Sequence, residues 1–161
     1  MLDYTKIIYL HGLESTSQSG KARQFAQKFP GMVTPDFTGS FEERMSQLLP
    51  ILGSERGWTI LGSSFGGLMG GVFTLEHESQ VRKLILLAPA LMLPPFPSLA
   101  DRRTVSVPTI LIHGTEDDVV PPAPVRALAE KAFSNLTCYQ VQDGHRLQKA
   151  FEELNWLQII E

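Results

Sequence analysis

Short, nearly uninterrupted apolar runs recur along this chain, and each of them ends close to a glycine or a proline. Such runs are typical of strands buried on both faces of a parallel sheet, because a solvent-exposed face would place polar residues at alternate positions. Six segments fit this description, and Pro35 indicates that the second of them lies at an edge. They are residues 6–10, 32–35, 58–61, 81–88, 107–112 and 136–142. We therefore expect a mostly parallel sheet of about six strands.

Stretches with helical periodicity separate these runs. In residues 19–29, apolar side chains recur at the i, i+3, i+4 and i+7 positions that form one face of a helix. Further helices are expected at 40–52, 65–78, 122–133 and 145–160. Ser40 followed by Glu43 has the pattern of a capping box at the start of a helix. Strands that alternate with helices predict a doubly wound α/β fold with helices on both faces of the sheet.

The size and charge of the chain limit its organisation and its partners. A length of 161 residues predicts one domain that spans residues 1–161. The net charge is −3, so the chain has no basic excess to neutralise phosphates, and we expect no binding of nucleic acid. Cys138 is the one cysteine, which excludes an intrachain disulfide and a cysteine-based zinc cage.

No apolar run approaches the roughly 18 residues that a membrane helix needs. The longest candidate, residues 84–93, is interrupted by Pro89. The first ten residues include Asp3 and Lys6 and have no long apolar segment typical of a signal peptide. We therefore expect a cytoplasmic protein with no membrane partner, and nothing in the sequence indicates its oligomeric state.

A G-x-S-x-G motif, Gly62–Ser63–Ser64–Phe65–Gly66, lies between a predicted strand and a predicted helix. This is the context of a nucleophile elbow, a sharp turn that exposes its central serine above the sheet. The flanking positions crowd the neighbouring strand and helix, which favours glycine there. The N-terminus of the following helix favours negative charge that develops near the serine. The motif predicts that Ser64 is a nucleophile.

A serine nucleophile needs a general base and an acid that orients the base, and after this motif they follow in the order acid, then histidine. Asp117 follows the fifth predicted strand, and His145 follows the sixth. Because the carboxyl ends of parallel strands lie at one edge of a sheet, we expect Ser64, Asp117 and His145 to converge there.

The acid has alternatives close by. Glu116 and Asp118 flank Asp117, and Asp143 precedes His145 by two residues. The residues alone leave the choice among these acids open, and Asp118 is the main alternative to Asp117.

These motifs resemble the α/β-hydrolase superfamily, in particular its compact, cap-less bacterial serine esterases. Four segments between Tyr9 and His145 carry the resemblance: Tyr9–Leu13, Gly62–Gly66, His113–Pro121 and Asp143–His145. The resemblance implies Ser64 as nucleophile and His145 as general base. It also implies Asp117 as acid, because the H-G-x-x-D spacing after the fifth predicted strand matches the family pattern. It also implies that the backbone N–H groups of Leu13 and Phe65 form the oxyanion hole, and that no metal or organic cofactor is needed.

The resemblance implies a serine hydrolase that cleaves carboxylic esters or thioesters of small acyl substrates through an acyl-enzyme. The alternative is a non-catalytic binding protein that keeps the fold. Residues 90–104 hold three prolines and several apolar residues, and we expect a short lid-like loop there. Candidate residues for contact with the substrate are His11, Phe65, Leu91, Met92, Leu93 and Phe96.

Two further histidines are expected to have structural roles, and the chain departs from the family pattern in two ways. His11 is expected mainly to support the oxyanion loop through hydrogen bonds, and His113 to be a structural group at a strand end. The chain starts at the position of the family's third strand and holds no inserted cap domain, so we expect an open site.

Overall fold

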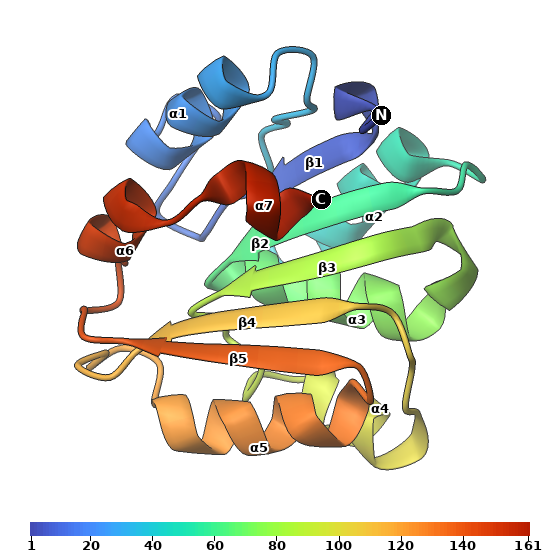
Figure 1. Cartoon of the computed structure of the whole chain (residues 1–161). Coiled ribbons are helices and arrows are strands. Elements are labelled where there is room, and N and C mark those ends of the chain that lie inside the picture. The colour runs from blue at the N-terminus through green and yellow to red at the C-terminus, as the bar shows by residue number, and fades with distance from the viewer.

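Five parallel strands form one sheet, in which they lie side by side in chain order (Figure 1). They are β1 (Ile7–Leu10), β2 (Trp58–Ser63), β3 (Val81–Leu87), β4 (Thr109–Gly114) and β5 (Leu136–Val141). This computed structural model describes residues 1–161. The predicted doubly wound α/β fold is confirmed, with five strands where the sequence indicated about six.

The segment 32–35 lies at the edge of the sheet but is too short to count as a strand. Val33 donates its N–H to the carbonyl oxygen of Ile7 (2.8 Å) and accepts from the N–H of Tyr9 (2.9 Å), so it forms a single parallel bridge beside β1. Pro35 has no N–H to donate, so the pairing does not extend further.

The helices divide between the two faces of the sheet because the chain reverses direction beside β1. It first moves outward from β1 through α1 to Val33, and then returns through α2 to β2. Since connections between parallel strands are right-handed, the helices of the outward and return paths lie on opposite faces. One face carries α1 (Gly20–Lys28), α6 (Gln148–Glu153) and α7 (Trp156–Ile160). The other carries α2 (Phe41–Leu52), α3 (Phe65–Glu76), α4 (Phe96–Arg102) and α5 (Pro122–Ala132) (Figure 1).

Two hydrophobic clusters fill the space between the sheet and these helices. The larger holds 27 buried residues under α2 to α5, and the smaller holds 16 under α1, α6 and α7. In β1, Ile8 and Leu10 point into the first cluster, whereas Ile7 and Tyr9 point into the second. Burial on both faces explains why β1 to β4 are nearly continuous apolar runs. The same expectation for β5 is wrong, because β5 lies at the edge of the sheet and none of its residues is fully buried.

Polar side chains cap the starts of α2 and α7, and the sequence predicts only the first of these caps. Ser40 and Glu43 form the expected capping box at the start of α2.

The prediction of a single helix over 145–160 is wrong: residues 145–147 form a loop, and the rest forms α6 and α7. The break comes at Asn155, because its side chain accepts from the N–H of Gln158 (3.3 Å) and starts a new helix. Two short 3-10 helices, Tyr4–Lys6 and Glu78–Gln80, precede β1 and β3.

The segment 90–104 is not a simple loop, because it contains the helix α4 and is anchored in the core by Leu91 and Phe96. Both side chains are fully buried in the larger cluster. They pack against Gly71 of α3, where an added Cβ would lie 3.0 Å from Phe96 and 3.3 Å from Leu91. Met92 and Leu93 do reach the surface. Movement of the segment as a lid stays a prediction.

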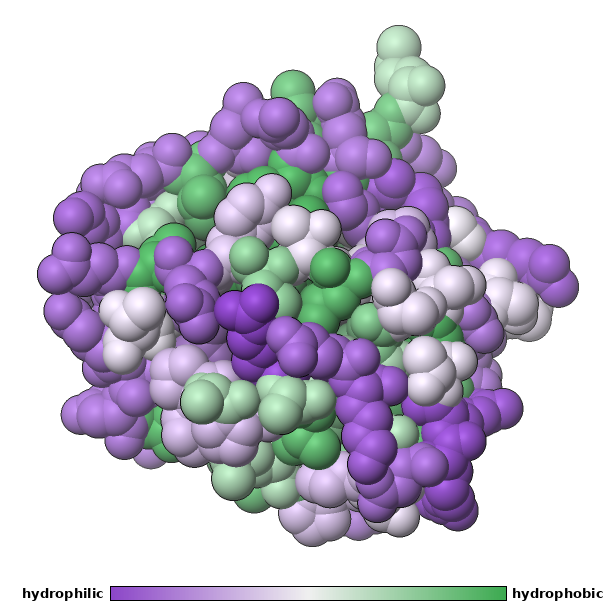
Figure 2. All heavy atoms as spheres, turned by 60° about the horizontal axis from the view of Figure 1, so that its bottom comes forward, coloured by the Kyte–Doolittle hydropathy of each residue, from purple (hydrophilic) through white to green (hydrophobic).

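The surface is mixed in character. On the side that Figure 2 brings forward, hydrophilic residues surround separate patches of hydrophobic ones. No helix of the protein has both the length and the apolar character needed to cross a bilayer.

Candidate active site

Ser64 lies on a strained turn between β2 and α3. Its backbone has φ 54° and ψ −114°, in a region that residues with a side chain rarely adopt. Two hydrogen bonds hold it there: its N–H donates to the carbonyl oxygen of Leu87 (2.9 Å), and its own carbonyl oxygen accepts from the N–H of Ala90 (2.9 Å). The end of β3 therefore fixes the direction in which the Ser64 side chain points.

The glycines of the motif allow this turn. A Cβ at Gly66 would collide with the carbonyl oxygen of Leu10 in β1, and one at Gly62 would collide with that of Gly66. Because these obstacles are backbone atoms, no side-chain rearrangement relieves them. The steric explanation for the two glycines therefore holds in detail.

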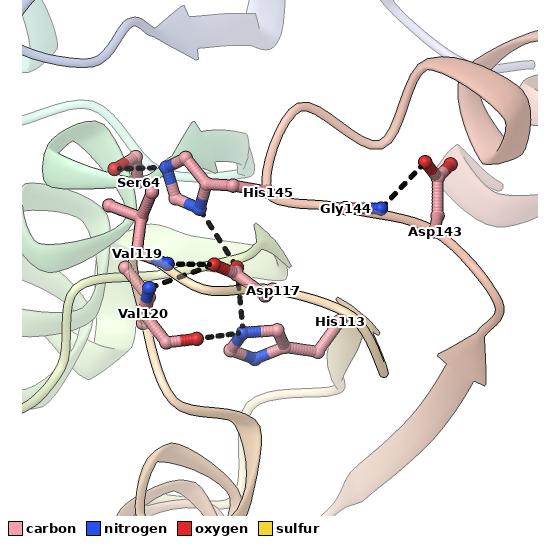
Figure 3. A network of polar contacts seen from close by, with 8 residues as sticks. All are labelled: Ser64, His113, Asp117, Val119, Val120, Asp143, Gly144 and His145. Atoms are coloured by element: carbon pink, nitrogen blue, oxygen red, sulfur yellow. Dashed lines mark hydrogen bonds and ion pairs between the residues drawn. The ribbon is translucent and has the colours of Figure 1, made fainter.

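Ser64, His145 and Asp117 form one hydrogen-bonded row, as the sequence predicts (Figure 3). His145 Nε2 lies 3.1 Å from Ser64 Oγ, and its Nδ1 lies 2.8 Å from Asp117 Oδ2. Since Nδ1 faces a carboxylate oxygen, it carries the ring proton. Nε2 is then free to accept a proton from the Ser64 hydroxyl. The row thus has the geometry to raise the nucleophilicity of Ser64.

The Asp117 carboxylate is buried and fully hydrogen-bonded. Its Oδ1 accepts from the N–H groups of Val119 (2.9 Å) and Val120 (2.8 Å), and its Oδ2 faces the rings of His145 and His113. Burial by itself would raise the pKa of Asp117. The hydrogen bonds from Val120, His145 and Val119 together outweigh burial and hold that pKa below its ordinary value. The group is therefore an anion at neutral pH.

The other acids near His145 do not face it. Glu116 and Asp118 are exposed. The Asp143 carboxylate accepts from the backbone N–H groups of Gly144 (2.8 Å) and Ala150 (2.9 Å), at the start of α6, and points away from the row (Figure 3). Among the acids that the sequence left open, Asp117 alone has the geometry to orient His145.

Backbone contacts hold the loop of Asp117 against the loop of His145. The N–H of Glu116 donates to the carbonyl oxygen of Asp143 (3.0 Å), and that of Thr115 to Val141 (2.8 Å). A Cβ at Gly114 would collide with the Asp143 carbonyl, so the loops approach this closely only because Gly114 has no side chain. No pattern in the sequence indicates this role of Gly114.

The backbone after β1 lies beside Ser64. A Cβ at Gly12 would be 3.5 Å from Ser64 Cβ. The N–H groups of Leu13 and Phe65, the expected oxyanion donors, donate to no group of the protein. His11 is buried, donates from Nδ1 to the carbonyl oxygen of Gly12 (2.7 Å) and accepts at Nε2 from the N–H of Phe37 (2.9 Å). It therefore supports the loop, as expected.

A cleft of about 1340 Å³ opens over Ser64 and His145. Four large hydrophobic side chains that remain exposed line it: Leu13 (55%), Met92 (48%), Leu93 (43%) and Val119 (65%). Phe65 also lines the cleft, whereas His11, Leu91 and Phe96 do not. The expectation that those three contact the substrate is corrected, because all three side chains are packed inside the protein. The structure also brings together no three His, Cys, Asp or Glu residues that could hold a metal ion.

A family profile described as "Serine hydrolase (FSH1)" matches residues 39–151, more than two thirds of the chain and the part that holds Ser64, Asp117 and His145. The chain belongs to the FSH1 serine hydrolase family. A comparison of this serine hydrolase with curated protein sequences found no match.

Solved structures place the serine hydrolase among the α/β hydrolases. It is similar to a hydrolase of the α/β superfamily from Xanthomonas campestris, at 26% identity and a TM-score of 0.72, with 91% of each chain covered. Mouse α/β hydrolase domain-containing protein 10 is 19% identical, with a TM-score of 0.76 over 95% of this chain and 87% of that one. A monoacylglycerol lipase from Paleococcus ferrophilus is 18% identical, with a TM-score of 0.69 over 95% and 89% of the two chains.

Two further side chains of this serine hydrolase line the cleft and were missed from the sequence. Burial raises the pKa of Tyr9 to about 12, partly offset by a hydrogen bond with Ser63, so its phenol stays neutral. Burial lowers the pKa of Lys21 from 10.5 to about 8; Asp143 opposes this shift, and Arg146 adds to it. Tyr9 begins a segment that carries the family resemblance, but no pattern in the sequence marks Tyr9 or Lys21 as part of the cleft.

Replacing Lys21 with methionine is expected to increase the free energy of unfolding at pH 7 by about 1–3 kcal/mol, because burial penalises the charged amine. The folded-state pKa lies below the unfolded one, so this penalty is full below pH 8 and is relieved as pH rises from about 8 to 10.5. Urea denaturation should therefore give a smaller gain at pH 9.5 than at pH 7. Lys28→Met, at an exposed position of the same helix, is the control. An equal gain at both pH values would contradict the prediction.

Proposed function

We propose that this protein cleaves carboxylic ester or thioester bonds of small acyl substrates through an acyl-enzyme on Ser64. The observation that carries the proposal is the row of hydrogen bonds from Asp117 through His145 to Ser64. A serine hydroxyl alone is a weak nucleophile, and a neutral imidazole in contact with it supplies the missing base.

In the proposed first step, His145 Nε2 takes the hydroxyl proton while Ser64 Oγ bonds to the acyl carbon. Asp117 holds the ring in the tautomer that leaves Nε2 free, and its negative charge stabilises the imidazolium that forms. The imidazolium then gives its proton to the departing alcohol or thiol, and the acyl-enzyme remains. His145 next takes a proton from a water molecule as that water attacks the acyl carbon. The imidazolium then gives this proton to Ser64 Oγ as the bond from Oγ to the acyl carbon breaks, which releases the acid and restores the Ser64 hydroxyl.

The oxyanion of each tetrahedral intermediate is proposed to accept hydrogen bonds from the N–H groups of Leu13 and Phe65. Their lack of a partner within the protein supports this role. Loss of one such donor typically costs about 3 kcal/mol of transition-state stabilisation. Phe65 is also the first residue of α3, whose N-terminus favours negative charge.

An uncharged acyl group of short to medium length is proposed to bind at the apolar part of the cleft. The apolar side chains of Leu13, Met92, Leu93 and Val119 border the cleft, and Phe65 adds an aromatic ring. The similarity to a monoacylglycerol lipase supports an ester as the bond that is cleaved.

A panel of p-nitrophenyl esters of increasing acyl length, with matched thioesters and anilides, tests the proposal. We expect turnover of esters and thioesters, fastest for short to medium acyl chains, and little cleavage of anilides. A fluorophosphonate probe should label the protein, with the added mass on the peptide that contains Ser64. No turnover across the panel and no labelling would refute the proposal. Tight acyl binding without turnover would instead favour a binding protein that keeps the hydrolase fold.

A further inference from the structure

His113 occupies a buried position directly behind the row of Ser64, His145 and Asp117. It is the fifth residue of β4 and only 3% exposed. Its Nε2 lies 3.1 Å from Asp117 Oδ2 and 3.0 Å from the carbonyl oxygen of Val120 (Figure 3). Both neighbours are acceptors, so Nε2 carries a proton and donates to them.

The surroundings of the other ring nitrogen, Nδ1, indicate that the His113 ring is neutral. Nδ1 is buried and has no hydrogen-bond partner. A proton on Nδ1 would leave an N–H without an acceptor in the interior, which costs more than leaving a lone pair there. The contacts therefore favour the neutral ring with its proton on Nε2. His113 is thus a fixed donor, unlike His145, whose ring exchanges protons with the substrate in the proposed mechanism.

We infer that His113 is a positioning residue that acts through Asp117; this inference rests on the proposed function. Asp117 Oδ2 accepts from both histidine rings, while the N–H groups of Val119 and Val120 hold Oδ1. Without the His113 donor, Oδ2 keeps one partner, and the carboxylate can turn about its last torsion. The contact of His113 with Val120 O also ties the loop of Asp117 back to β4.

The hydrogen bond from His113 to Asp117 is expected to affect the rate of the chemical step rather than the binding of substrate. The direction of Oδ2 determines where the His145 ring points, and hence how Nε2 meets the Ser64 hydroxyl. His113 does not line the cleft, so substrate binding does not depend on it directly. A residue that only fills space in the core would instead change stability and leave the turnover of folded molecules unchanged.

The first test compares three variants of His113 by ester turnover and by urea denaturation. His113→Leu should lower kcat by about tenfold to a hundredfold with KM little changed, because a hydrogen bond to a charged group is lost. His113→Gln carries an amide N–H that can reach the position of Nε2, so it should stay within a few-fold of the native kcat. The shorter His113→Asn should resemble His113→Leu. If the leucine variant does not fold, the contrast between glutamine and asparagine decides.

The second test repeats His113→Leu in a protein that already carries Asp117→Asn. With no carboxylate to position, the additional loss of kcat should be less than about twofold. An equal loss in both backgrounds, or no loss in the native background from a folded His113→Leu variant, would overturn the inference.

A third measurement does not depend on turnover, so it separates this inference from the proposed function. The nitrogen NMR spectrum of the native protein at neutral pH should show the His113 ring with its proton on Nε2. His113→Gln should leave the remaining histidine signals in place. A His113 proton on Nδ1 would refute the positioning role, even in an active enzyme. If the tautomer is as expected but no substrate turns over, the proposed function fails instead.

Discussion

Replacing Ser64 with alanine is expected to lower kcat for a short-chain p-nitrophenyl ester by about 10⁵- to 10⁶-fold and to abolish labelling by a fluorophosphonate. The Ser64 hydroxyl is the only one within hydrogen-bond distance of His145. Removing it leaves no atom to form the acyl-enzyme, and loss of the nucleophile in a serine hydrolase typically removes nearly all of its triad-dependent rate. The oxyanion donors remain, so a small residual rate over the uncatalysed reaction is expected.

Ser63→Ala is the matched control for this variant. Ser63 precedes Ser64, lines the same cleft and is also partly buried, but it contacts neither His145 nor Asp117. It should keep kcat within a few-fold of the native value and should still be labelled. Folding is checked by urea denaturation of both variants. If Ser64→Ala keeps its activity while Ser63→Ala loses it, the proposed nucleophile is wrong.

The fold and the nucleophile elbow could be predicted because they depend on local steric requirements, which determine the residue types found at each position. Strands buried on both faces need continuous apolar runs, and the structure places such runs in β1 to β4. The edge strand β5 differs, because it contains no fully buried residue and Thr137, Tyr139 and Gln140 are exposed. The turn at Ser64 needs glycine at positions 62 and 66, since backbone atoms occupy the space of a side chain. The convergence of Ser64, Asp117 and His145 then depends only on the carboxyl ends of parallel strands lying at one edge.

Features that depend on distant packing were not predictable in the same way. Leu91 and Phe96 follow prolines in a loop-like segment, and their burial depends on Gly71, which lies in another helix. The helical periodicity also did not predict the break at Asn155, because the apolar spacing continues across this residue. A side chain that caps a new helix changes the backbone without changing the hydrophobic pattern.

The choice between neighbouring acids shows the same limit. In sequence, Glu116, Asp117 and Asp118 differ only by a position in a short loop. The fold buries the middle one and surrounds it with donors, and leaves the other two exposed. The spacing after β4 favoured Asp117, and three of its four hydrogen-bond donors lie in the same segment, His113–Pro121. The fourth donor, His145, comes from another loop, and the burial that distinguishes Asp117 from its neighbours depends on the fold.

Replacing Asp117 with asparagine is expected to lower kcat by about 10⁴-fold, the typical loss when the acid of such a triad becomes an amide. Both carboxylate oxygens face donors only: two backbone N–H groups at Oδ1 and two imidazole rings at Oδ2. Either orientation of an amide therefore points its NH₂ group at other donors. If the amide NH₂ group faces His145, the imidazole adopts the other tautomer, which carries its proton on Nε2. Nε2 then no longer accepts the Ser64 proton.

Asp118→Asn is the control, because Asp118 is adjacent, exposed and also borders the cleft. This variant should keep most of the activity.

The Asp117→Asn variant should also lose about 1–3 kcal/mol of unfolding free energy at pH 7. The folded-state pKa of Asp117 is lowered, so the carboxylate stabilises the fold above its unfolded pKa of about 3.9 and loses this effect as pH falls through the lower folded value. The stability difference between native and variant protein should therefore shrink in acid. A greater loss of kcat in Asp118→Asn than in Asp117→Asn would transfer the role of the acid to Asp118.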